Sequence, residues 1–133
     1  MHFLFLALAA IAVPDPAAGG IAARAAARPE AVRIDLANFR ISPRRLSLVH
    51  GHAYVLELVN RSASGHDFTA RDLFASARIS GVDPATLVRG TIEVPANATV
   101  RIGLVPLQAG RFEFHCGHPF HAALGMRGRI NVL

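Results

Sequence analysis

The chain contains one cysteine, Cys116, among its 133 residues. An internal disulfide is therefore impossible. In an exported protein, a lone cysteine indicates a reactive or metal-bound thiol. Hydrophobic residues make up 52% of the sequence and charged residues 17%, so the chain can form a packed core, and its length predicts one domain.

Lysine is absent, so arginine supplies all 14 basic residues, against 9 acidic ones, for a formal net charge of +5. We interpret most of this excess as a solvated surface. A second interpretation is docking on an acidic partner protein or an anionic membrane. Basic runs interleaved with aromatic residues are also missing, which argues against binding to nucleic acid.

The sequence has no apolar run long enough to span a bilayer. Residues 1–13 are apolar and about as long as the hydrophobic region of a signal peptide. We predict a signal peptide over residues 1–20, a linker rich in small residues over 21–30 and a single domain over 31–133. The protein is then periplasmic or otherwise exported; the alternative is an uncleaved N-terminus that anchors it to a membrane.

Period-two alternation of apolar residues predicts a series of short strands separated by turns. The first strand covers 32–36 and continues irregularly through 39–43. In the second, Leu46, Leu48 and His50 share one face. Further strands are expected at 53–59, 66–69, 91–94, 99–105, 112–116 and 127–133, with one or two helical turns at 71–77. This spacing predicts an all-β, antiparallel β-sandwich with at most one short helix.

The segment that follows residue 111 contains most of the candidate metal-binding side chains. Phe112, Phe114 and Cys116 alternate with charged or polar residues, so Cys116 is expected to face the core and His115 to face outward. Gly117 and Pro119 end the strand, and the loop after them presents further donors.

Cys116, His121 and Met126 offer a thiolate, an imidazole and a thioether on one short loop. These soft donors suit copper, with the methionine as a weak axial ligand. Such a site needs a second imidazole, and the candidate is His66, which follows an apolar strand and the loop 60–65.

The Cys-x4-His-x4-Met loop, followed by Gly-x-Ile-x-Val, resembles the cupredoxins, the small blue copper proteins of the rusticyanin, azurin and plastocyanin type. The resemblance covers roughly residues 31–133 and implies a Greek-key sandwich. It implies one type 1 copper held by His66, Cys116 and His121, with Met126 axial, in a monomeric, non-enzymatic carrier of single electrons between redox partners. The electron would pass at the exposed edge of His121, inside an apolar rim formed by Phe120, Ala122, Ala123 and Leu124. A copper-delivery protein with the same ligands is the alternative, and a domain with an empty site is a third hypothesis.

Several other residues leave alternatives open. His118, which we interpret as a surface residue, is the alternative ligand to His121. Asp67 would favour Cu(II) by its charge if it points inward. His50 and His52 resemble a His-x-His pair of multicopper oxidases, but 7 histidines are too few for the four pairs of their trinuclear cluster.

A binuclear copper centre would need a second cysteine. Zinc also binds cysteine and histidine, but the methionine at loop spacing argues against a structural zinc site. The sequence shows neither a nucleophile with an adjacent base nor a glycine-rich phosphate loop.

Overall fold

The computed structural model describes residues 28–133, and most of their regular structure is β-strand. One short α-helix, α2 (Arg71–Ala75), and one 3-10 helix, η1 (Pro84–Gly90), lie in that range. The strands are β1 (Glu30–Ala37), β2 (Arg40–Ser42), β3 (Arg45–Leu48), β4 (Tyr54–Asn60), β5 (His66–Thr69), β6 (Ala77–Ser80), β7 (Thr91–Val94), β8 (Thr99–Pro106), β9 (Gly110–His115) and β10 (Arg127–Val132).

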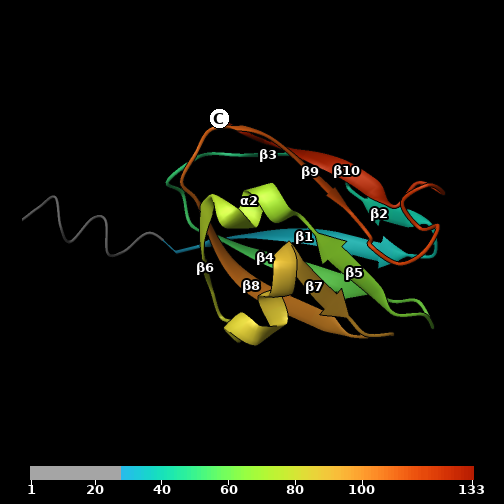
Figure 1. Ribbon diagram of the computed structural model, residues 1–133. Helices are drawn as coiled ribbons and strands as arrows, with labels where there is room; N and C mark the ends of the chain where they lie inside the picture. The colour runs from blue at the N-terminus through green and yellow to red at the C-terminus, as the bar shows by residue number, and fades with distance from the viewer. Residues whose placement is uncertain (1–27) are drawn as a thin grey trace, which may run out of the picture.

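The strands form two five-stranded sheets (Figure 1). The first has the order β2-β1-β4-β8-β6 and the second the order β3-β10-β9-β5-β7. The predicted all-β sandwich with one short helix is confirmed for the described residues. Most neighbouring strands are antiparallel, but β1 with β4 and β3 with β10 are parallel pairs. Apolar alternation carries no information on strand direction, so it did not predict these two pairs.

One hydrophobic core fills the space between the sheets. It includes Leu56 and Ile102 from the first sheet and Phe68 and Phe114 from the second, all fully buried. The rings of Phe68 and Phe114 are in contact, with centroids 5.1 Å apart. Burying each such side chain contributes about 1.5–3 kcal/mol, so this core holds the two sheets together without any disulfide.

The segment 39–43 does not continue the first strand, and that prediction is wrong. The chain reverses at the turn before β2, where Phe39 has a φ of 62°, and β2 runs back antiparallel to β1. The reversal places Ile41 opposite Leu36, and both side chains are fully buried. Hydrophobic burial therefore favours a hairpin over one longer strand.

His50 is also not on a strand face, because β3 ends at Leu48. His50 is exposed, and its Nδ1 lies 2.9 Å from the carbonyl oxygen of Leu133. The Nε2 of His52 lies 3.7 Å from the carboxylate of Glu30. The turn between β3 and β4 that carries these histidines lies near the C-terminus, at the end of the sandwich away from the β9–β10 loop (Figure 1). The two histidines therefore take no part in the candidate metal site.

Strand β6, at the edge of the first sheet, was not predicted. It follows α2 directly and pairs antiparallel with β8. The predicted signal peptide, and the linker up to residue 27, lie outside the described residues. From residue 28 to the C-terminus, no helix is long and apolar enough to cross a membrane.

Candidate metal centre

His66 is the first residue of β5, and its side chain is fully buried. Strand β5 pairs with β9 through Thr69 and His115. Cys116, one residue beyond the end of β9, therefore lies beside β5, as expected for a strand that supplies the second histidine. The backbone N–H of Asp67 donates to the Sγ of Cys116 at 3.4 Å, which ties the thiol to the neighbouring strand.

The loop from Cys116 to Met126 is closed by its own backbone hydrogen bonds. The N–H of Cys116 donates to the carbonyl of Met126, and the N–H of Met126 donates to the carbonyl of His121, each at 2.9 Å. Gly125 has a φ of 115°, a conformation that glycine adopts at little cost. The positions of the three loop residues are therefore coupled to one another.

His66, Cys116 and His121 come together at this end of the sandwich. The Nδ1 atoms of the two histidines lie 3.3 Å apart, and the Nδ1 of His121 lies 3.4 Å from Cys116 Sγ. The three donor atoms all lie within 4.8 Å of one another. Two imidazole nitrogens bound to one ion at about 2.0–2.1 Å in a near-trigonal plane would lie about 3.5 Å apart, so this spacing fits a shared metal ion.

Met126 is fully buried in the core, directly after the loop. Its backbone bonds to Cys116 and His121 hold it beside both predicted ligands. Its role as axial ligand stays a prediction, as do the roles of the other three.

Burial controls the ionisation of the donors. The pKa of His66 is lowered, first by desolvation and then by the nearby imidazoles of His121 and His118, while Asp67 acts in the opposite direction. Burial raises the pKa of the Cys116 thiol. Without a metal, the site near neutral pH therefore holds a neutral imidazole and a protonated thiol. A metal ion must displace the thiol proton when it binds.

The carboxylate of Asp67 is buried and faces the start of the loop. Its Oδ1 accepts hydrogen bonds from the N–H of Gly117 at 2.7 Å and from the hydroxyl of Thr69 at 2.9 Å. Both hydrogen bonds hold the carboxylate against the end of β5 and the start of the loop. The direction that the sequence left open is therefore inward, toward the Cys116 end of the loop.

His118 is partly exposed and lies between two carboxylates. Its Nε2 is 3.3 Å from Glu93 and 3.6 Å from Asp67. Its ring also stacks on that of His121, with centroids 5.4 Å apart. Asp67, Cys116 and His118 form a second group of potential ligands that shares the thiol with the first. His118 is thus part of the site's surroundings, and its role as an alternative ligand stays open.

Sequence comparison identifies the family. The profile of the cupredoxin-like domain matches residues 2–132. The chain belongs to the cupredoxin-like family. Comparison with curated protein sequences finds no match.

Solved structures share this cupredoxin-like fold at low sequence identity. Dithionite-reduced auracyanin from Roseiflexus castenholzii has a TM-score of 0.60 and 16% identity, over 80% of this chain and 99% of that one. Auracyanin A, a "blue" copper protein from Chloroflexus aurantiacus, has a TM-score of 0.57 and 20% identity, over 80% and 100%. A multicopper oxidase from Campylobacter jejuni has a TM-score of 0.57 and 18% identity, over 80% of this chain and 31% of that one. The fold is thus found in blue copper proteins and within multicopper oxidases.

The donors in this cupredoxin-like domain fit copper by their chemistry. Two imidazoles and one thiolate, beside a buried methionine, are the ligands that blue copper sites use. Family membership and the His66–Cys116–His121 group together identify copper as the cofactor that the site fits.

Two contacts of the cupredoxin-like site were missed by the sequence analysis. The Nε2 of His66 lies 3.0 Å from the hydroxyl of Ser62, which itself donates to Oδ1 of buried Asn60 at 2.7 Å. The ring of Phe39 contacts that of His121 edge-on, with centroids 5.5 Å apart. Ser62 lies four residues before His66 in a polar loop, which is the only signal in the sequence. Nothing in the sequence indicated Phe39.

Proposed function

We propose that this protein is an exported blue copper protein that carries single electrons. The observation that carries the proposal is the convergence of His66, at the start of β5, with Cys116 and His121, in the loop after β9, on one point. These three residues would hold one copper ion, with Met126 as the axial ligand. We further propose that the protein is a monomer without catalytic activity and that it exchanges electrons with a redox partner protein.

Bound copper would supply a one-electron couple between Cu(I) and Cu(II). The chain's own contribution is to hold the donors in one arrangement in both states. His66 is held by its strand and by Ser62, and Cys116 by the N–H of Asp67. His121 is held by the closed loop and by contact with Phe39. Little movement on electron transfer means a low reorganisation cost, which favours a carrier.

The proposal of a non-enzymatic role is supported by the number of histidines. A multicopper oxidase needs several copper ions, and the 7 histidines of this chain cannot supply its cluster.

Copper delivery is the second candidate, and one observation favours it. The second ligand group, Asp67 with Cys116 and His118, offers an ion a neighbouring position on a partly exposed residue. An ion that can exchange its buried ligands for a group closer to the surface can be released to another protein. A carrier, by contrast, must keep its metal in both oxidation states.

The experiment is metal loading followed by redox cycling. Adding Cu(II) should produce a strong blue absorption from thiolate-to-copper charge transfer, and Cys116→Ser should lack it while remaining folded. A protein that stays colourless with Cys116 reduced would contradict the proposal. Repeated reduction in the presence of a competing Cu(I) chelator then separates the candidates, because a carrier retains copper and a delivery protein loses it.

Export is tested separately. The mature protein recovered from its native host should begin between residues 13 and 29, as measured by intact mass. A full-length mass in the cytoplasmic fraction would remove this part of the proposal.

A further inference from the structure

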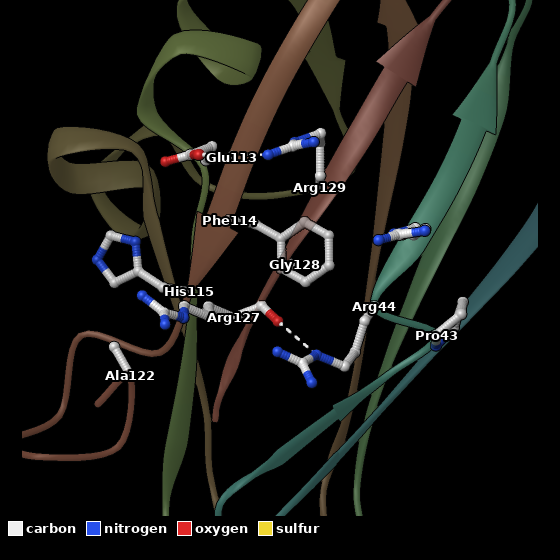
Figure 2. A pocket seen from close by; sticks show the side chains of 10 residues that line it. Pro43, Arg44, Glu113, Phe114, His115, Ala122, Arg127, Gly128 and Arg129 are labelled. Carbon is white, nitrogen blue, oxygen red and sulfur yellow. Dashed lines mark hydrogen bonds and ion pairs between the residues drawn. The ribbon is translucent and has the colours of Figure 1, made fainter. Parts of the chain in front are cut away.

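An open groove of about 1050 Å³ lies on the outer side of β3, β9 and β10 (Figure 2). We call it the arginine groove, because four of the residues that line it are arginines: Arg44, Arg45, Arg127 and Arg129. All four are exposed. Neither the candidate metal site nor the family assignment explains why these arginines gather there.

The strand register brings the arginines together. Arg129 pairs with Arg45 in the parallel β3–β10 pair and with Glu113 in the antiparallel β9–β10 pair. Arg127 pairs with His115. Residues two apart on a strand share a face, so the outward face of three adjacent strands carries this charge.

Gly128 makes the groove possible, because it lets two other groups approach the strand. A Cβ atom at this position would meet the ring of Phe114 and the backbone oxygen of Arg44. Arg44 is held to β10 by two hydrogen bonds: its carbonyl accepts from the N–H of Arg129 at 2.8 Å, and its Nε donates to the carbonyl of Arg127 at 3.3 Å. Figure 2 shows the ring of Phe114 beside Gly128, and the bond from Arg44 to Arg127.

The charge in the groove is largely uncompensated. Glu113 is the only acidic residue that lines it, and its contact with Arg129 is long, at 4.0 Å. Across the described part of the chain, the guanidinium groups of Arg45 and Arg127 have no ion-pair partner. Such groups are available to bind carboxylates from another molecule, each through two parallel N–H···O bonds.

The groove also borders the candidate metal site. Two of its lining residues, His115 and Ala122, are the direct neighbours of Cys116 and His121 in the chain. A partner seated in the groove would therefore lie against the backbone next to two of the predicted copper ligands.

We infer that the arginine groove is the docking surface for the acidic surface of a redox partner protein. The inference rests on the proposed electron-carrier function, and it identifies the partner by its carboxylates. A bilayer is flat and meets protruding rather than concave surfaces. Single-stranded nucleic acid needs exposed aromatic rings for stacking, and the phenylalanine in the groove is fully buried.

The test is an NMR titration of the ¹⁵N-labelled protein, kept reduced with ascorbate, with a hexaglutamate peptide. Amide shifts are expected over residues 44–45, 113–115 and 127–129. Arg45→Glu should weaken binding about threefold to tenfold, because a charge at the contact is reversed. Arg78→Glu is the matched control, since Arg78 is an exposed arginine on β6 of the other sheet. It should change the affinity less than twofold.

Three outcomes would overturn the inference. In the first, the amide shifts caused by the peptide are spread over all surfaces that carry arginines. Another is an equal loss of affinity in Arg78→Glu, which would mean that net charge alone is responsible. The third is tighter binding, on the same residues, to vesicles with anionic lipid or to a DNA oligonucleotide than to the peptide.

A second measurement links docking to electron transfer. In the reaction with hexacyanoferrate(III), one electron passes from the reduced copper protein to the iron, which becomes hexacyanoferrate(II). Arg45→Glu should slow this reaction severalfold and Arg78→Glu should not; equal rates would overturn the link. If the protein binds no copper but the peptide still binds in the groove, the proposed function fails, and the groove stands only as a carboxylate-binding surface without a redox partner. If copper binds and the peptide shifts are not localised, the docking inference fails alone.

Discussion

The Nε2 atom of His66 lies 3.0 Å from the hydroxyl oxygen of Ser62. Ser62 donates its own proton to Asn60 Oδ1, so its oxygen is free to accept the N–H of His66. This assigns the proton of His66 to Nε2 and leaves the Nδ1 lone pair facing Cys116 and His121. Hydrogen bonds of this kind orient a metal-binding histidine and set its tautomer.

Replacing Ser62 should therefore weaken metal binding. We expect Ser62→Ala to lower copper affinity about 10–100-fold, as is typical when the partner of a metal-ligating histidine is lost. Competition with a Cu(I) chelator measures the affinity. Ser64→Ala is the matched control, because Ser64 is exposed and only its backbone carbonyl accepts hydrogen bonds. Equal affinities in the two variants would show that Ser62 does not position His66.

The two loop histidines should differ in their effect on the copper spectrum. His121→Ala is expected to destroy the blue absorption or open the copper to exogenous ligands, because His121 Nδ1 lies 3.4 Å from Cys116 Sγ. His118→Ala should leave the spectrum nearly intact, because His118 faces Glu93 and Asp67 instead. The reverse result would mean that the metal uses the ligand group with Asp67.

Met126→Leu should keep the copper and raise its reduction potential. A weak electron donor to Cu(II) would be lost, and Leu preserves the bulk of a fully buried side chain. Protein-film voltammetry of the two forms gives the comparison. An unchanged potential would show that the sulfur is not a ligand.

The metal-free protein should lose stability in mild acid. In the unfolded chain, His66 takes up a proton near the ordinary histidine value of about 6.5. Its pKa in the folded protein is lowered, mainly by burial. Between these two values the unfolded state binds more protons, so the stability present above about pH 6.5 is lost as the pH falls toward the folded value. Urea titrations at pH 7.5 and 5.5 measure this loss, and it should be smaller in His66→Gln.

Gly128→Ala should destabilise the fold. The added methyl group would meet the ring of Phe114 and a backbone oxygen, which cannot move aside as a flexible side chain can. Overpacking of this kind costs about 1–3 kcal/mol in the free energy of unfolding. Gly65→Ala is the control, since its Cβ would make only an ordinary contact, 3.8 Å from His118 Cε1. Equal urea midpoints for the two variants would contradict the tight packing at Gly128.

Much of the β-sandwich could be predicted from the sequence. Burial alternates along β8 and β9 as the apolar pattern requires, since the pleat of a strand sends successive side chains to opposite faces. The hairpin at β2 and the strand β6 could not be predicted, because they are short and their place is decided by the sheet edges they join.

The sequence by itself determined the part of the candidate site that lies on the loop between β9 and β10. Cys116, His121 and Met126 lie within eleven residues, so covalent spacing alone keeps three donors close together. Tertiary structure decided the rest. The pairing of β5 with β9 brings His66 to a thiol fifty residues away, and the Asn38–Phe39 turn brings an aromatic ring to His121. The arginine groove likewise depends on the register of three strands from distant parts of the chain. A sequence pattern reports which face a side chain takes, but which distant side chain lies opposite depends on strand pairing, and that is settled only when the whole core packs.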